Sequence, residues 1–521
     1  MMQSTSCSAC GAWPRSFAAA LSRRQSRSLG ASIALSSHSV DSQIYRVTCC
    51  SYRSRRRGYG GVLNLRSVSR VAATDEDGSS FSLFDDVFDD HDDGTLGGSL
   101  CLMSSSEGED SDTEIIINTS GDVDYHRNNA SDVSGSYLET SRLANLRIRT
   151  KHKRTYLGIL NNLGLIIFLV GILFLFDVCA WRIVRLPLAP FFLTGPFLVA
   201  ACLASFAGFF CVPLFHVLKI HQVLRVEGPD IHLYKKGTAT MGGLFFIPVG
   251  IIVAGAASDF SSIEVFGAAA ATIAFAAIGL LDDSLILMKK HNYGLPAPIK
   301  IILEVAAGTS FSFWLNSTNV ASPYSMKFLL PLPAPLGLLC IGRLYLLLAT
   351  FCFVSMANGV NLTDGLDGLA GGVAALTFVG MSIAVLPICP DLSVFGASMS
   401  GACIGFLMHN RYEASIFMGD TGSLALGGAL AAMASCTGMF FPLIISSVVF
   451  IAEVLSVLIQ LGFYRLTKRF YGAGRKLFRM APVHHHFELS GFKEPSIVAT
   501  AYVVSGIFAL VAGYAMGYGC G

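Results

Sequence analysis

Four polar blocks carry most of the candidate chemistry of this 521-residue chain, and each lies at the end of a long apolar run. The blocks are Leu281–Asp283, Asn358–Gly368, Met418–Ser423 and Ala481–His486. An ionisable side chain at the border of an apolar segment is costly to place, which makes it a candidate functional residue. Asp, Asn and His also bind metal ions or carry protons in metal-assisted reactions on anionic substrates.

The adjacent carboxylates of Asp282 and Asp283 are candidates for proton transfer and for cation binding. Their mutual repulsion lets one act as a base while the other stays ionised. Lys289, Lys290 and Lys300 follow, and a carboxylate pair beside lysines suits a cation or a phosphate. An ordinary polar cap at the end of a membrane helix is the structural alternative.

The second and third blocks supply further oxygen ligands. Asn361, Asp364 and Asp367 are spaced three apart, so a helix starting at Leu362 would place the two aspartates on one face. Asp420 lies between glycines, and the aromatic ring three residues before it, Phe417, could stack on a base. The alternatives are a solvated Gly-rich turn and a core aromatic residue.

Two basic segments suit anions. His484, His485 and His486 lie in a basic connection and suit phosphate or sugar recognition, or proton transfer. The segment from Lys235 to Gly243 joins lysines, hydroxyls and glycines before an apolar run, which is a natural anion site, although it lacks the order of a Walker loop. Exposed histidines and a basic membrane anchor are the structural alternatives.

Taken together, these residue types indicate a divalent cation, Mg²⁺, that is held by oxygen ligands and binds a diphosphate. Lysine and histidine supply positive charge for phosphoryl transfer. A site at the membrane border implies a lipid co-substrate.

The elements that position these blocks are membrane-spanning helices. Hydrophobic residues make up 53% of the chain and charged residues 14%, a profile that excludes an ordinary soluble enzyme. A spanning helix needs about 20 apolar residues. The expected spans are 157–179, 194–218, 241–258, 263–281, 299–315, 337–357, 368–388, 394–409, 423–437, 439–463 and 496–518.

The polar blocks fall in alternate connections between these spans, so all are expected on one face of the membrane. Lys and Arg gather on that face, most densely in the connection 465–495, and the run 142–154 places the N-terminus there too. The opposite face has few, namely Arg182, Arg185, Lys327 and Arg343. The positive-inside rule therefore predicts that the polar blocks face the cytoplasm or the stroma.

The N-terminal residues are expected outside the helical body. Residues 1–74 are rich in Ser and Arg with one acid, Asp41, which is typical of a plastid or mitochondrial transit peptide. Residues 75–154 are acidic and then basic, and we interpret them as a disordered extension. Residues 155–521 form the expected multi-span domain. A disordered basic tail is the alternative for the first segment.

At this level of detail the blocks resemble the phospho-N-acetylmuramoyl-pentapeptide transferases, within the polyprenyl-phosphate N-acetylhexosamine-1-phosphate transferase superfamily. The resemblance runs from about Gln222 to Pro495. The Asp-Asp and Gly-Asp-Thr-Gly-Ser blocks are shared across that superfamily, whereas the triple histidine and the Lys235–Gly243 segment point to the muramoyl-pentapeptide branch.

The resemblance implies an all-α polytopic fold of ten helices, to which this chain adds one N-terminal span. It also implies a reaction. Polyprenyl phosphate attacks the β-phosphate of UDP-N-acetylmuramoyl-pentapeptide in the presence of Mg²⁺, giving UMP and lipid I. Carried over residue by residue, Asp420 and Asn361 bind the metal, and Asp282 and Asp283 handle the lipid phosphate. The resemblance implies that the uridine is bound by Lys235, Thr240, Asn410 and Phe417, and that the nucleoside-sugar pocket is lined by Asp364, Leu366 and Asp367. It also implies that sugar or phosphate is recognised by His484, His485 and His486, of which His485 is also a catalytic candidate. Lys300 is the implied phosphate contact.

The chain departs from the family pattern at three places. Ile286 stands where the family often has a lysine, which removes one phosphate contact and puts rate or affinity in doubt. Thr-Ala-Thr at 238–240 and Tyr-Glu-Ala at 412–414 replace sequences that contain proline, which changes backbone stiffness only.

The resulting prediction is a plastid membrane enzyme whose site, a cleft roofed by the connection 465–495, faces the stroma. Its expected partners are UDP-N-acetylmuramoyl-pentapeptide, polyprenyl phosphate and membrane lipid. No nucleic-acid partner is expected, and the sequence leaves open whether the protein forms a homodimer. The nearest alternative is a polyprenyl-phosphate GlcNAc-1-phosphate transferase, with which the triple histidine conflicts. A transporter would place acids near mid-bilayer, and a non-catalytic scaffold would not need every acid of the motif set.

Overall fold

The structure is a computed structural model that describes residues 132–182, 189–221, 235, 237–289, 294–318, 329–332 and 337–517, with side chains between 155 and 514. The expected transit peptide, residues 75–131 of the expected extension, Lys236 and Lys290 lie outside the described residues. Residues 132–154 of that extension were expected to be disordered, but they are helical and form the first part of α2 (Asp132–Arg182).

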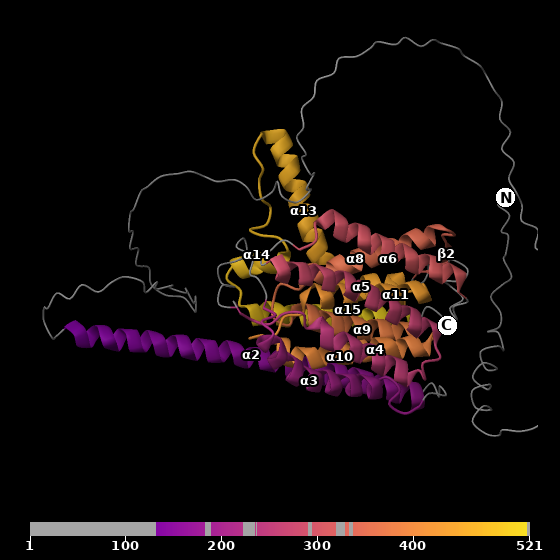
Figure 1. The fold of residues 1–521 in the computed structure, drawn as a ribbon, viewed down its shortest axis with the longest axis horizontal. Coiled ribbons are helices and arrows are strands. Elements are labelled where there is room, and N and C mark those ends of the chain that lie inside the picture. Colours follow the sequence, from indigo (N-terminus) through magenta and orange to yellow (C-terminus); the bar gives the residue numbers. More distant parts are fainter. Residues whose placement is uncertain are drawn as a thin grey trace, which may run out of the picture. The chain divides into compact units, whose positions relative to one another are not determined.

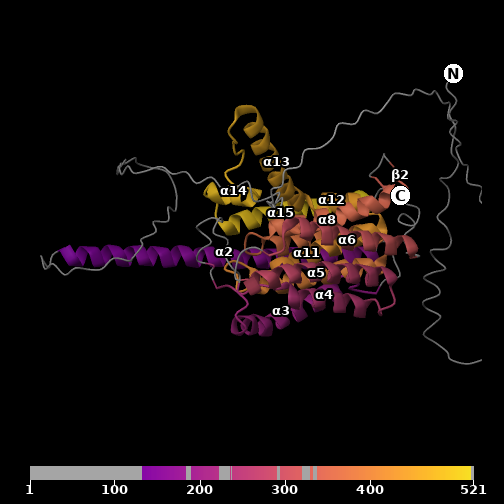
Figure 2. The same cartoon turned by 45° about the horizontal axis from the view of Figure 1, so that its top comes forward.

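Helices make up nearly all of the described chain (Figures 1 and 2). They are α2 (Asp132–Arg182), α3 (Thr194–Val217), α4 (Gly243–Ala257), α5 (Ile263–Lys289), α6 (Ala297–Ser317), α8 (Leu344–Thr363), α9 (Leu369–Val385), α10 (Pro390–Asn410), α11 (Gly419–Thr437), α12 (Phe440–Ser446), α13 (Val448–Tyr471), α14 (Val483–Leu489) and α15 (Glu494–Gly517). The described residues also include two short strands, β1 (Leu329–Pro331) and β2 (Leu338–Cys340), which pair antiparallel.

The expected polytopic helical fold is confirmed. Within the described residues, eight helices are long and apolar enough to cross a membrane, and α4 and α9 are shorter apolar helices. Every one of the eleven expected spans coincides with a helix, the one at 439–463 with the pair α12 and α13.

The centre of the bundle consists of α9, α10 and α11, which are buried on almost every side. Helix α10 packs against α3, α4 and α9, while α11 packs against α5 and α8. All three central helices are rich in Gly, Ala and Ser, and small residues let helix backbones approach closely inside a membrane.

The outer helices present large apolar side chains outwards. Phe206, Phe209 and Phe266 are all more than 60% exposed. Such a surface would be a liability in water, but lipid covers it in a membrane, where helices satisfy their own backbone groups. The pattern of exposure therefore agrees with the apolar runs of the sequence.

The additional N-terminal span is α2, and one buried acid joins it to the next helix. Asp177 accepts hydrogen bonds from the backbone amides of Leu193 and Thr194 and, at 2.7 Å, from the Thr194 hydroxyl. These amides belong to the N-terminus of α3, whose donors have no partner inside their own helix. Asp177 thus caps α3 from a neighbouring element.

Two expected spans differ in detail from the observed helices. The range 337–357 was too early, because Gly337 and Gly342 adopt left-handed φ values of 72° and 55° around the strand β2, and the helix starts at Leu344. The range 439–463 is interrupted at Ser447, where the Ser446 carbonyl accepts a hydrogen bond from Thr377 of α9. A carbonyl that finds a partner on a neighbouring helix allows a break inside an apolar segment.

Candidate active site

Four helices bring together the carboxylates and cation of the polar blocks. Lys300 of α6 lies between Asp282 of α5, at 3.0 Å, and Asp420 of α11, with which it also forms an ion pair. Asn361 of α8 donates a hydrogen bond of 2.9 Å from its amide to Asp420. These residues lie up to 138 positions apart in the sequence, from 282 to 420, so only folding brings them together into a single site.

The close approach of α5 and α11 depends on a missing side chain. A Cβ atom at Gly279 would lie 2.1 Å from the backbone oxygen of Asp420, which is closer than real atoms come. Gly279 therefore lets the Asp282–Asp283 end of α5 reach the start of α11.

Asp283 holds the N-terminus of α11. Its carboxylate accepts hydrogen bonds from the backbone amides of Asp420, at 3.1 Å, and Thr421, at 2.9 Å, and from the Thr421 hydroxyl at 2.7 Å. A carboxylate at a helix N-terminus satisfies orphan donors and interacts favourably with the helix dipole. The arrangement fixes the position of Asp420, the next candidate ligand.

Exposure distinguishes the three charged side chains of the cluster. Asp420 is 27% exposed, whereas Lys300 and Asp282 are 14% and 8% exposed. Asp420 is therefore the most accessible carboxylate to a ligand that arrives from outside the bundle. The cluster already accommodates one cation, the Lys300 ammonium, between two carboxylates.

The donor set fits Mg²⁺ when a diphosphate completes it. Among the described residues, no three His, Cys, Asp or Glu side chains converge into an all-protein metal site. Mg²⁺ commonly uses one or two protein oxygens together with water and substrate phosphates, and Asp420 with Asn361 offers this kind of set.

Asp364 and Asp367 do not share a helical face, contrary to the helix considered from Leu362. Helix α8 ends at Thr363, a turn follows, and α9 starts only after Gly368, whose φ of 83° ends the turn. The glycines of the block favour this turn over a continuous helix. Burial, together with the nearby carboxylates of Asp420 and Asp283, raises the pKa of Asp364 to about 8.

Lys235 and Asp367 form a buried network rather than an open anion site. The Lys235 ammonium lies 2.8 Å from Asp367 and 2.7 Å from Glu494, the first residue of α15. Burial lowers the pKa of Lys235, but the attraction of the Glu494 and Asp367 carboxylates outweighs it and raises the pKa to about 12. Burial and Glu494 raise the pKa of Asp367 to about 6. The neighbouring Leu366 is buried as well.

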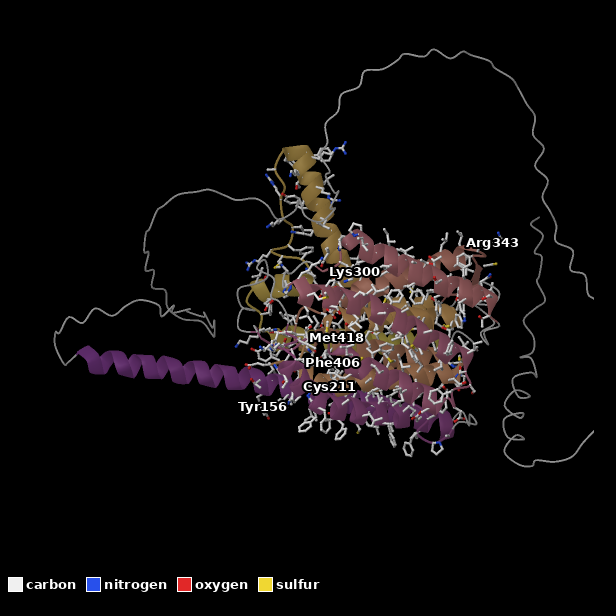
Figure 3. The ribbon with its side chains drawn as sticks, in the orientation of Figure 1. Tyr156, Cys211, Lys300, Arg343, Phe406 and Met418 are labelled. Carbon is white, nitrogen blue, oxygen red and sulfur yellow. The ribbon has the colours of Figure 1, made fainter. Side chains whose placement is uncertain are left out.

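The expected uridine residues occupy the segments that join these helices. Asn410 is buried and bonds backbone groups on both sides, accepting from Gly368 at 3.1 Å and donating to Ile416 at 2.8 Å. Thr240 is also buried. Phe417 is half-buried; its backbone amide donates to the Ala239 carbonyl at 2.8 Å and its carbonyl accepts from the Gly242 amide at 2.9 Å, which links this segment to the Lys235–Gly243 block. Figure 3 shows Met418, the neighbour of Phe417, within the body of the bundle.

The three histidines lie on a helix, α14, although a loop was expected across 465–495. His484 is buried against the polar turn, since a Cβ atom at Gly365 would lie 2.3 Å from its Nε2 atom. Its Nδ1 atom lies 3.1 Å from a Glu453 carboxylate oxygen. His485 lies 3.1 Å from Glu488, and His486 accepts a backbone hydrogen bond from Arg479 at 3.2 Å.

Three glutamates of this region were not expected from the sequence. Glu494 joins the Lys235 network, Glu453 faces His484, and Glu304 accepts a hydrogen bond from Asn358. Each of the three glutamates lies within or at the edge of an apolar run, so the rule that intramembrane ionisable residues are functional candidates would have found them.

Ile286, the departure from the family lysine, packs beside Gly294 near Asp282. The carboxylate pair nevertheless retains a lysine, because Lys300 reaches it from α6.

The bundle has a polar-block end and an opposite end. Figure 3 places Tyr156, at the start of the first span, and Arg343, which precedes α8, at opposite ends of the bundle. This matches the alternation expected from the connections, in which the N-terminus shares a face with the polar blocks and Arg343 does not.

Comparison with known proteins agrees with this geometry. A family model described as glycosyl transferase family 4 matches residues 265–438, the part of the chain that holds Asp282, Lys300, Asn361 and Asp420. The fold and the site together define a multi-pass membrane phospho-sugar transferase.

Curated relatives narrow this class. A phospho-N-acetylmuramoyl-pentapeptide-transferase of Nostoc punctiforme is 44% identical over 333 residues, which cover 63% of this chain and 89% of the relative. Proteins of the same name from Synechocystis and Microcystis aeruginosa are each 42% identical, over 62% and 67% of this chain and 88% and 94% of their own lengths. The chain belongs to the phospho-N-acetylmuramoyl-pentapeptide-transferase family.

Proposed function

We propose that this protein transfers phospho-N-acetylmuramoyl-pentapeptide from its UDP conjugate to polyprenyl phosphate. An oxygen of the lipid phosphate forms a bond to the β-phosphorus, the bond from that phosphorus to the UMP oxygen breaks, and UMP leaves with the electron pair. The product is lipid I. The names of the curated relatives support the muramoyl-pentapeptide substrate over GlcNAc-1-phosphate.

The observation that carries the proposal is the meeting of Asp282, Lys300, Asn361 and Asp420 from four helices at the polar-block end. A transporter is disfavoured because these acids gather at one end of the helices. Phosphoryl transfer needs positioning and charge stabilisation more than covalent chemistry, and this cluster offers both.

Asp420 and Asn361 are the residues that we propose to hold Mg²⁺. The bound ion would neutralise charge that develops on the diphosphate. Lys300 would orient a phosphate beside the ion, and Asp282 would hold Lys300 in place or accept a proton from the lipid phosphate. Asp283 serves mainly to hold the start of α11.

We assign the remaining sequence candidates by their accessibility. Phe417 and the neutral carboxyl of Asp364 would contact the nucleoside sugar. His485 and His486 would contact the sugar or phosphate from α14. The other six candidates are buried and would support the side chains that line the pocket; they are Lys235, Thr240, Leu366, Asp367, Asn410 and His484.

The N-terminal composition and the cyanobacterial relatives support a plastid location. Residues 1–74 would be the transit peptide, residues 75–154 an extension, and residues 155–521 the transferase domain with its site towards the stroma. Import of a fluorescent fusion of residues 1–74 into isolated chloroplasts would test this assignment, and retention of the fusion outside would contradict it.

The activity is tested by UMP release from purified protein given polyprenyl phosphate, Mg²⁺ and one of two UDP sugars. Turnover of UDP-N-acetylmuramoyl-pentapeptide alone is expected. Turnover of UDP-N-acetylglucosamine alone would reassign the sugar specificity. Asp420→Ala should abolish turnover and weaken the dependence on Mg²⁺, and near-normal activity of this variant would refute the metal assignment.

A further inference from the structure

Glu304 is a buried carboxylate in the wall of the site that the proposed reaction does not use. It lies on α6 with no exposed surface. One of its oxygens, Oε2, accepts a hydrogen bond of 2.5 Å from the Asn358 amide. The other, Oε1, is buried and has no hydrogen-bond partner among the described residues. A buried acceptor without a partner is costly, so its retention calls for an explanation.

Lys300 lies one helical turn before Glu304. Residues four apart share a helix face, with Cβ atoms about 6 Å apart. Glu304 also interacts electrostatically with Lys300, Asp282 and Asp420. The flexible Lys300 side chain can therefore point its ammonium along α6 in either of two directions, towards the carboxylate pair or towards Glu304.

The position of Lys300 conflicts with the binding of a second cation. Its ammonium pairs with Asp420, the most exposed carboxylate of the cluster and the proposed metal ligand. A divalent ion at Asp420 would repel the ammonium and compete for the same oxygen. Lys300 must then weaken its contact with Asp420, and an ammonium with only 14% of its side chain exposed needs another acceptor.

We infer that Glu304 is a positioning residue that receives the Lys300 ammonium when Asp420 binds a divalent cation. The Oε1 atom is the acceptor, and Asp282 remains the second partner of Lys300. The exchange keeps a lysine beside the site without placing it on the metal ligand. This inference rests on the proposed function, because it takes Asp420 as the metal ligand.

The test is the affinity of the full-length protein for Mn²⁺ alone, measured by electron paramagnetic resonance as the free ion disappears. Glu304→Gln keeps the size of the side chain and an acceptor for Asn358 but offers the ammonium no charge. We expect it to weaken Mn²⁺ binding by about tenfold, because Lys300 then competes for Asp420. Glu264→Gln, which changes a buried glutamate at the start of α5 that has no part in the proposed site, is the matched control and should bind Mn²⁺ like the wild type.

A double-variant cycle separates this exchange from a general effect of charge. Lys300→Met should bind Mn²⁺ more tightly than the wild type, and adding Glu304→Gln to it should change nothing further. An equal loss in both backgrounds would show that Glu304 acts only through its field and would overturn the inference. Unchanged affinity of Glu304→Gln, or no Mn²⁺ binding by the wild type, would overturn it as well.

The proposed function is judged separately, by UMP release from the wild type. Turnover of the muramoyl substrate together with additive effects in the cycle would leave the reaction intact and reject only the role of Glu304.

Discussion

Substitution of Asp283 by Asn should disturb the site through the backbone of α11. Asp283 accepts three hydrogen bonds, two from backbone amides and one from the Thr421 hydroxyl. If the side-chain oxygen of the new asparagine faces Thr421, its side-chain NH₂ group faces the backbone N–H of Asp420. Two hydrogen-bond donors then oppose each other, and no hydrogen bond forms between them. One hydrogen bond to a charged group is then lost, at about 1.5–3 kcal/mol, and the helix dipole loses its anion, at about 1 kcal/mol.

The expected destabilisation is therefore about 2.5–4 kcal/mol, a large fraction of the stability of a typical domain. Thermal unfolding in detergent should show a lower midpoint for Asp283→Asn. Thr421→Val removes only the hydroxyl contact and keeps the carboxylate, so its shift should be smaller than that of Asp283→Asn. Mn²⁺ binding should weaken in Asp283→Asn although this residue is not a proposed ligand, because Asp420 is no longer held in place.

The contrary result is well defined. If Asp283→Asn unfolds at the wild-type temperature and binds Mn²⁺ normally but does not turn over, Asp283 acts in chemistry and not as the anchor of α11. Normal stability, metal binding and turnover together would refute both roles.

Three further predictions concern other parts of the site and fold. The pKa of Asp364 in the folded protein, about 8, lies above the ordinary value, so Asp364 binds more protons in the folded state than in the unfolded state. The stability of the protein should therefore fall as pH rises from about 4 to 8. Asp364→Asn should flatten this pH dependence in thermal unfolding, and an unchanged dependence would contradict the assignment. Gly365→Ala should weaken substrate binding, seen as a raised KM, because its Cβ would displace His484, whereas Gly462→Ala, which meets nothing within 4 Å, should leave KM unchanged; equal effects would refute the contact. Asp177→Ala should lower the thermal midpoint, since three buried donors lose their acceptor at about 1–3 kcal/mol each, yet leave the metal affinity intact; a midpoint equal to that of the wild type would contradict the capping role.

Several expectations failed where glycine or serine overrode an apolar pattern. The turn at Asp364 and Asp367 replaced a helix because Gly365 and Gly368 permit a chain reversal. The break at Ser447 interrupts an apolar run that has no sequence signal for it other than its hydroxyls and Pro442. Apolar periodicity reports burial in lipid, and it carries little information about where a backbone bends.

The sequence by itself located the apolar helices, because lipid demands long apolar segments, although it misplaced the start of α8 and missed the break between α12 and α13. It also located the polar blocks, because charge is costly at the borders of apolar segments. It also pointed to Asp282, Lys300, Asn361 and Asp420 as one site. Only the tertiary structure decided which of the candidates are accessible. Lys235 and Asp367 are buried in a network with Glu494 of α15, which lies 259 residues after Lys235 in the sequence. No local sequence pattern can encode such a pairing. Likewise, the contacts of Asp283 with the start of α11 depend on Gly279, which lets α5 and α11 approach at close range.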